Sequence, residues 1–397
     1  MSQVRRTSVR TVAYATLALA VAFYAPLSFT YFAFGSPTSN GRLQDHVFEI
    51  LISPSFAFGV GSGHADNFPT FAHTYATMWL HSVVGTVALL AGLSQFWTGL
   101  HVRHRKLHRV LGKLFISSCF VVAVTAAIYL IRTPQSAVFS GPVFNEELWL
   151  LALGTAGSAT LAYVAIRRKD LIAHREFVAY AFALICSAPW LRIAWASVAI
   201  AWDAQKEMIN LFALQFGPTF LLTCAMLYSS KYWKGRRGIE SPLASSRALI
   251  GGAATGVVGL VVLTVASASV DWNEPHPAWF VPGWAPILIG GLVPWLLHTA
   301  WLSVMARRAS THGNLAAGAA WRTYLGGALA APAVGAVGLG YATQVQGIPV
   351  QQAWYAVAYI GATSVAFAYA AHATLTTRWA RDWPAKPSAS TAEPDLV

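Results

Sequence analysis

Ten long apolar stretches dominate the chain, and short polar segments separate them. Each stretch is long enough to cross about 30 Å of hydrocarbon as a helix. A backbone in lipid has to satisfy its own hydrogen bonds, which a helix does within one segment. The pattern therefore predicts an all-α, polytopic transmembrane helical bundle with about ten spans, at residues 11–34, 72–97, 110–132, 148–166, 177–202, 209–228, 248–270, 285–306, 321–343 and 354–376.

The polar segments between the spans indicate how the chain is organised. Residues 35–71 form the longest one on the side opposite the main basic clusters, and we expect a short helix near residues 44–52. The final residues are rich in Pro, Ser and Ala, which is typical of a disordered tail. These features predict a six-span N-terminal bundle (1–233), a cytoplasmic linker (234–246), a four-span C-terminal bundle (247–383) and a disordered tail (384–397).

Composition supports a membrane protein and argues against a soluble one. The chain is 56% hydrophobic and only 11% charged, whereas soluble domains carry roughly 25% charged residues. The net charge of +12 would suit a nucleic-acid partner, but the basic residues form short clusters between apolar stretches. We therefore expect the lipid bilayer as the main partner, and no nucleic-acid binding.

The basic clusters predict the orientation of the bundle. If the N-terminus is cytoplasmic, the clusters all fall in cytoplasmic loops, as the positive-inside rule requires; they lie at 103–109, 167–175, 231–237, 307–308 and 378–381. Four basic residues do not fit this pattern: Arg42, Arg132, Arg192 and Lys206. An even number of spans then places both termini in the cytoplasm. The predicted location is the bacterial cytoplasmic (inner) membrane.

Histidine and arginine are the ionisable residues that the pattern places at membrane depth. His81 lies in the second span and shares a helical face with Gly85, Gly92 and Gln95, because fourteen residues make close to four turns. Ionisable residues at this depth are costly and often mark a functional site. The sequence therefore singles out the face around His81.

The fifth span carries a second pair of such residues. His174 and Arg192 are five turns apart and so share one face. Arg192 lies at the depth of His81, whereas His174 lies with His108 near the cytoplasmic ends of spans five and three. We therefore expect an outer His81/Arg192 level and an inner His108/His174 level.

Two interpretations of these levels stay open. The polar side chains could simply hydrogen-bond across the bundle, at about 1 kcal/mol each. Alternatively, His108 and His174 could ligate a haem iron, with glycines making room for the macrocycle and an arginine pairing with a propionate. No Asp or Glu lies in the middle of a span, and Glu147 and Glu176 lie only at the edges. This absence argues against proton-coupled carriers and magnesium-dependent prenyltransferases.

Two segments resemble a known bacterial family. They are LHSVVGTVALLAGLSQFWTGLHVRHRKLHRVLGKLF and RRKDLIAHREFVAYAFALICSAPWLRIAW, and the family is the predicted membrane proteins grouped as domain of unknown function 2306. The resemblance covers residues 80–196 and implies no established activity. It marks as motif positions His81, Gln95, His108, Arg109, Gly112, His174, Arg175 and Arg192.

The bundle is also loosely similar to cytochrome b561-type membrane haem proteins, which place paired histidines on facing helices. The outer level lacks an obvious second histidine, so this resemblance implies at most one haem b, with His108 and His174 as its iron ligands.

The sequence leaves three functions open. The first is transmembrane electron transfer through haem b, with a quinone or another redox partner. The second is a permease or small-molecule-binding protein in which His81, Arg192 and Gln95 line the path, and an anionic substrate would suit Arg192. The third is a membrane enzyme that uses His81 or His174 as acid or base. The candidate cofactor-binding residues are His81, Gln95, His108, Arg109, His174, Arg175 and Arg192. Substrate and oligomeric state stay open.

Overall fold

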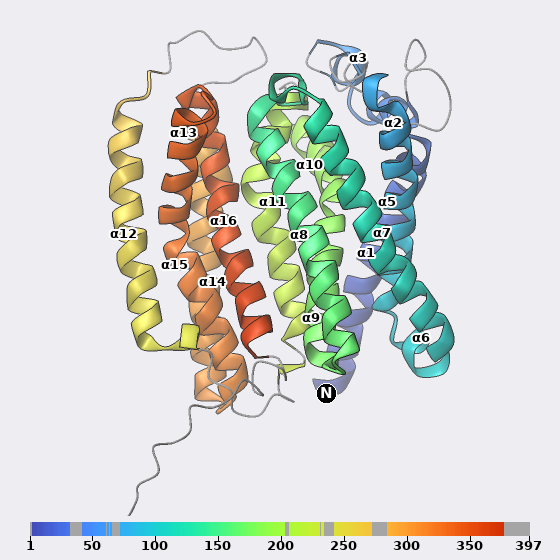
Figure 1. Ribbon diagram of the computed structural model, residues 1–397, viewed down its shortest axis with the longest axis vertical. Coiled ribbons are helices and arrows are strands. Elements are labelled where there is room, and N and C mark those ends of the chain that lie inside the picture. Colours follow the sequence, from blue (N-terminus) through green and yellow to red (C-terminus); the bar gives the residue numbers. More distant parts are fainter. Residues whose placement is uncertain are drawn as a thin grey trace, which may run out of the picture.

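The helices of this protein stand side by side in one bundle (Figure 1). The structure is a computed structural model that describes residues 2–31, 42–60, 62, 64–65, 72–202, 206–230, 232–233, 242–271 and 284–376. All regular secondary structure in these residues is helical. The long helices are α1 Ser2–Thr30, α5 Tyr75–Gln95, α7 Arg105–Arg132, α8 Gly141–Arg167, α9 Leu171–Ile185, α10 Ser187–Ala201, α11 Lys206–Ser229, α12 Ser246–Ala268, α14 Val293–Thr311, α15 Leu315–Gln344 and α16 Val350–Leu375.

Each of the ten predicted spans coincides with helical structure. Within the described residues, seven helices are long and apolar enough to cross a membrane: α5, α7, α8, α11, α12, α15 and α16. The bent pair α9–α10 makes an eighth span if it crosses as one unit. The prediction of an all-α bundle with several transmembrane helices is therefore confirmed, with seven or eight candidate spans.

The two ends of the bundle differ in character. One end, at the bottom of Figure 1, carries the N-terminus, the short helix α6 (Thr98–Arg103) and the turn between α8 and α9; we call it the basic end. The opposite end carries α2 (Leu43–Leu51) and α3 (Pro54–Phe58). We call these two helices the cap and this end the cap end. The short helix predicted near residues 44–52 is α2.

A sharp bend separates α9 from α10. The two helices meet at Cys186 with an angle of 42° between them. Pro189, in the first turn of α10, has no N–H, so the carbonyl of Ile185 four residues earlier loses its helical donor. A proline of this kind is a common cause of a sharp helix kink. The bend follows directly from the sequence.

The last helix of the bundle joins the predicted C-terminal region to the N-terminal one. The Tyr359 hydroxyl of α16 donates to the backbone oxygen of Val143 in α8, at 2.8 Å. The Tyr369 hydroxyl donates to the backbone oxygen of Glu176 in α9, at 2.9 Å. The two regions are in direct contact, and the proposed boundary between them stays a prediction. Of the predicted linker only residues 242–246 are described, and the predicted tail lies outside the described residues.

Candidate functional site

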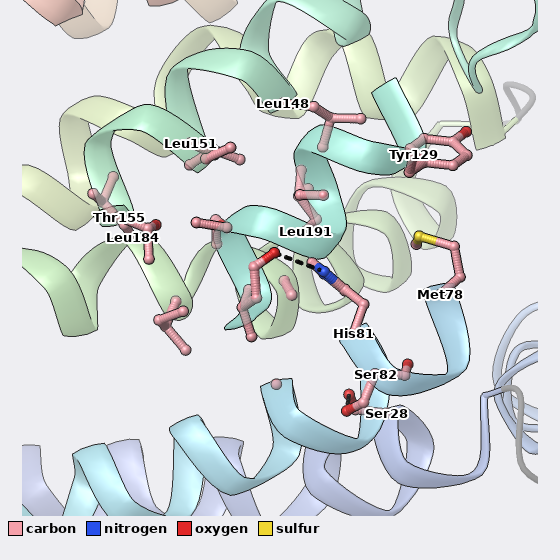
Figure 2. Close-up of a pocket in the computed structure, with 18 of the residues that line it drawn as sticks. Ser28, Met78, His81, Ser82, Tyr129, Leu148, Leu151, Thr155, Leu184 and Leu191 are labelled. Atoms are coloured by element: carbon pink, nitrogen blue, oxygen red, sulfur yellow. Dashed lines mark hydrogen bonds between the residues drawn. The ribbon is translucent and has the colours of Figure 1, made fainter. Parts of the chain in front are cut away.

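His81 and Arg192 line the same cavity, which has a volume of about 230 Å³. His81 comes from α5 and Arg192 from α10, and the rest of the wall comes from α1, α7, α8, the end of α9 and the segment that precedes α8. Figure 2 shows His81 of α5 near Leu191 of α10, and Leu148 of α8 lines the same cavity. Most of the lining is apolar, with a few hydroxyl groups such as that of Ser28. A mainly apolar cavity with a few polar groups is typical of a small-molecule site.

Two sequence features keep this space open. The residues at the α9–α10 bend, among them Ile185 and Ser187, form part of the cavity wall, so the kink caused by Pro189 shapes it. Gly85 lines the cavity from α5, and a Cβ added there would meet its nearest atom, Cγ2 of Val122, only at 4.0 Å. A side chain at this position would extend into the cavity.

A neighbouring helix fixes the ring of His81. Its Nδ1 lies 3.1 Å from the backbone oxygen of Val122 and 3.0 Å from Oγ1 of Thr125, both in α7. A carbonyl oxygen can only accept, and the Thr125 hydroxyl already donates to the backbone oxygen of Val121 at 2.7 Å. Nδ1 therefore carries the hydrogen, which leaves Nε2 of the neutral ring as an acceptor for a bound molecule.

Arg192 brings a positive charge to the cavity without a carboxylate beside it. Its Nε donates to Oε1 of Gln44 in the cap, at 3.2 Å. Its guanidinium lies 4.8 Å from the ring centroid of Trp195 and 5.6 Å from that of Tyr24. Among the described residues, no Asp or Glu forms an ion pair with it. A neutral amide and two aromatic faces solvate the guanidinium only in part, so an anion in the cavity would gain a strong partner.

A charged cluster lies next to Trp195 at the cap end. Nε of Arg42 lies 2.7 Å from Oδ2 of Asp45, and Nζ of Lys206 lies 3.9 Å from Oδ1 of the same carboxylate. Burial alone would raise the pKa of the Asp45 carboxyl, but Arg42 and Lys206 outweigh burial and hold this pKa below its ordinary value. The sequence analysis did not identify this cluster. The sequence contains one indication of the cluster: Arg42 and Lys206, like Arg192, are among the four basic residues that do not fit the positive-inside pattern.

The inner level of histidines is built differently. Nδ1 of His174 donates to the backbone oxygen of Ala162 in α8, at 2.9 Å, and His108 lies half-buried in the first turn of α7. Gly92, on the face predicted to make room for a macrocycle, packs against aromatic rings. A Cβ there would lie 2.5 Å from Cδ2 of Phe182 and 2.8 Å from Cε2 of Phe115. These rings leave no room for a macrocycle at Gly92, and the assignment of His108 and His174 as haem ligands stays a prediction.

The other motif positions lie away from the cavity. Gln95 packs on Gly112, where a Cβ would lie 3.1 Å from Oε1 of Gln95. Arg109 is exposed and donates to the backbone oxygen of Arg105 at 3.3 Å, and the Arg175 guanidinium lies 4.6 Å from the ring centroid of Tyr232. Gln95, Arg109 and Arg175 are all outside the cavity lining. In the described part of the chain, no group of three or more His, Cys, Asp or Glu side chains could hold a metal ion.

Two carboxylates near helix ends are more deeply buried than the sequence indicates. Glu147 lies in the second turn of α8 and Glu176 in the second turn of α9, and both are buried. Nε1 of Trp233 donates to Oε1 of Glu176 at 2.6 Å. Their positions near the span edges agree with the prediction, and the contact that covers Glu176 comes from Trp233, far away in the sequence.

Residues 78–226 match the family described as "predicted membrane protein (DUF2306)". The match confirms the resemblance found in the sequence and extends it through most of α11. It includes His81, Arg192 and the α9–α10 bend, and it begins after the cap. No curated protein and no solved structure matches the chain. The family description supports an integral membrane protein and assigns no activity.

Proposed function

We propose that the protein binds a small organic anion in the His81/Arg192 cavity, as a permease or as a membrane-embedded binding protein. The observation that carries this proposal is that Arg192 lines a mainly apolar cavity inside the bundle, with no carboxylate of the described residues paired to it. Arg192 is half-buried, and a cation that is partly withdrawn from water without a counter-ion carries a desolvation cost, which an anionic ligand would offset.

The cavity favours a particular kind of ligand. A carboxylate or similar acid group would accept hydrogen bonds from the Arg192 guanidinium, since charge-assisted bonds of this type are strong. A hydroxyl or N–H elsewhere on the molecule would donate to Nε2 of His81. The apolar remainder would lie against Leu148, Leu151 and Leu191. A volume of about 230 Å³ lies below the roughly 300–1,000 Å³ of typical drug-sized pockets, which favours a short-chain acid.

We further propose that the chain crosses the bacterial inner membrane ten times, with both termini in the cytoplasm. Support comes from the basic residues of α6, of the first turn of α7 and of the α8–α9 turn, which all lie at one end of the bundle. Cytoplasmic loops are enriched in Lys and Arg. In this orientation the cap faces outward, and the cavity lies nearer to the outer side.

Haem-based electron transfer is not part of this proposal. Gly92, predicted to make room for a macrocycle, packs against Phe115 and Phe182, so this glycine gives no support to a haem between His108 and His174. A membrane enzyme with His81 as acid or base would use the same cavity. It would need a reacting group close to His81, and we identify no such group among the described residues.

Titration calorimetry on the protein in lipid nanodiscs tests the proposal. The probes are straight-chain carboxylates, from acetate to octanoate, and inorganic phosphate, with the matching amides as neutral controls. We expect a short carboxylate to bind and its amide to bind much more weakly. Arg192→Ala should weaken carboxylate binding about tenfold or more, because a hydrogen bond to a charged group contributes roughly 1.5–3 kcal/mol.

The matched control is Arg175→Ala, which removes an arginine that also packs on an aromatic ring but lies outside the cavity. This variant should bind the carboxylate like the unmodified protein. Equal affinity in Arg192→Ala, or a failure of every carboxylate and of phosphate to bind the unmodified protein, would overturn the proposal.

A further inference from the structure

The cap covers the cavity from one side. Three residues that line the cavity also contact α2 or the residue that precedes it. The Arg42 guanidinium lies 4.4 Å from the ring centroid of Tyr31, Gln44 accepts from Arg192, and the rings of Phe48 and Trp195 lie 6.1 Å apart. A molecule that approaches the cavity from the cap end therefore meets α2 first.

Two polar side chains of the cap contact two positively charged side chains of the bundle. Gln44 lies on Arg192, and Asp45 lies on Lys206; the exposed fractions of Gln44, Asp45 and Lys206 are 2%, 0% and 1%. Both contacts leave hydrogen-bonding capacity unused. The hydrogen-bond partner of Arg192 in the cap is the neutral amide of Gln44 rather than an anion. Nζ of Lys206 has no hydrogen-bond partner in the part of the chain that the structure describes, and its carboxylate stands at 3.9 Å.

Aromatic rings provide the rest of the surroundings of Lys206. Its Nζ lies 5.1 Å from the ring centroid of Phe48, 5.3 Å from that of Phe56 and 5.9 Å from that of Trp195. Two of these rings belong to the cap. Cation–π contacts compensate for only part of the lost hydration of an ammonium group. The closed cap therefore satisfies Lys206 poorly, and an anion in direct contact with Nζ would satisfy it better.

We propose that the cap is the gate of the cavity and that Lys206 is the first anion contact on the route to Arg192. The inference rests on the proposed function for the identity of the ligand, an organic anion with a carboxylate or phosphate group. When the cap moves away, Asp45 leaves Lys206 and Gln44 leaves Arg192. The bundle then presents two cations without carboxylate partners, one at the mouth of the cavity and one inside it.

The gate is tested without any ligand, by the accessibility of a cysteine introduced at Met78, which lines the cavity. The native cysteines Cys119, Cys186 and Cys224 are replaced by alanine, and Met78→Cys is added. The protein is reconstituted in lipid vesicles, and the measurement is the rate of labelling by a membrane-impermeant methanethiosulfonate. We expect slow labelling with the native cap, and labelling about tenfold faster in Asp45→Asn. Gln44→Ala should give a smaller acceleration.

A matched control in the same helix is Glu49→Gln. Glu49 is half-exposed and pairs with His46 within α2, at 3.1 Å, so its loss should leave the labelling rate unchanged. Thermal unfolding of each variant shows whether it is folded. If folded Asp45→Asn and Gln44→Ala both label at the rate of the native cap, the cap is not the gate. Fast labelling with the native cap intact would overturn the gate as well.

The role of Lys206 is tested by the charge of the reagent. In the Asp45→Asn background, an anionic methanethiosulfonate should label the Met78→Cys protein several-fold faster than a cationic one of similar size. Adding Lys206→Met should remove most of that preference. If the preference survives the change, Lys206 is not the first anion contact. Because no carboxylate ligand is used, these results are independent of the calorimetry: a working gate with no ligand binding would reject only the proposed function.

Discussion

The outer and inner levels of the bundle begin from similar sequence features and end as different structures. Each level has a histidine whose Nδ1 is bonded to a backbone oxygen of a neighbouring helix, His81 to Val122 and His174 to Ala162. The face of α5 that carries His81 also carries two glycines. At Gly85 the space is open, whereas at Gly92, seven residues on, two phenylalanine rings fill it. Polar residues at the same depth in the membrane therefore do not by themselves form a binding cavity. Whether a cavity forms depends on the size of the side chains that face the glycines.

The prediction with the largest expected effect is that the inner level binds no haem. Because Phe115 and Phe182 occupy the space beside Gly92, we expect the purified protein to show no Soret band and no reduced α-band, even after haem is added during expression. Optical spectra of the oxidised and reduced protein provide the measurement. A Soret band that disappears in His108→Ala and in His174→Ala would support the haem hypothesis. The inner level would then be a ligand site rather than a filled part of the bundle.

Replacing each glycine by alanine should affect stability differently at Gly85 and at Gly92. Gly92→Ala forces Phe182 and Phe115 to shift, and overpacking of this kind costs about 1–3 kcal/mol. Gly85→Ala adds its methyl to the cavity without a clash, and Ala loses less backbone entropy than Gly in a helix, so this variant should not destabilise the protein and could gain up to about 1 kcal/mol. Chemical unfolding of both variants in the same detergent gives the two values. Equal destabilisation would mean that the cavity at Gly85 is not open.

His81 and His174 should contribute equally to the free energy of unfolding, but only His81 should contribute to carboxylate binding. Each makes an interhelical hydrogen bond to a backbone oxygen, so His81→Ala and His174→Ala should each lower the free energy of unfolding by about 1 kcal/mol. Only His81→Ala should also weaken carboxylate binding, because His81 lines the cavity and His174 does not. If His174→Ala weakens binding as strongly, while the protein stays folded, the separation of the two levels is wrong.

The cap end should respond to acid through Asp45, and this effect is the smallest. The folded-state pKa of Asp45 is lowered, so its stabilising contribution is complete above the unfolded-state value of about 3.9 and is lost as the pH falls through the folded-state value. Arg42, Lys206 and His64 face this carboxylate. Unmodified protein should therefore exceed Asp45→Asn in unfolding temperature at about pH 7 and about pH 5, and lose this advantage only below about pH 4. An advantage already lost at about pH 5 would contradict the lowered pKa.

Much of the fold follows from the sequence because local patterns determine it. The ten apolar stretches coincide with helices in the part of the chain that the structure describes, Pro189 accounts for the α9–α10 bend, and the polar segment before the second span contains α2 as expected. Helical periodicity and depth also selected His81 and Arg192, which do line one cavity. Within a span, spacing along the helix translates directly into face and depth.

The remainder depends on contacts between distant segments. Asp45 and Lys206 are far apart in the sequence and meet in the structure, and no periodicity relates them. The filling of the inner level likewise depends on which aromatic rings of α7 and α9 face Gly92. One usable signal existed: three of the four basic residues outside the cytoplasmic pattern gather around Asp45 and the cavity. Exceptions to the positive-inside pattern are therefore as informative here as the histidines at depth.

The most direct test of the central claim is to locate a bound anion. Crystals of the protein would be soaked with a bromine-substituted short-chain carboxylate at a concentration that saturates binding, and anomalous scattering would locate the bromine. We expect one bromine peak inside the cavity beside Leu148 and Leu191, with the carboxylate on Arg192, and no such peak in Arg192→Ala. A peak outside the cavity, or an unchanged peak in Arg192→Ala, would contradict the assignment of this cavity as an anion site.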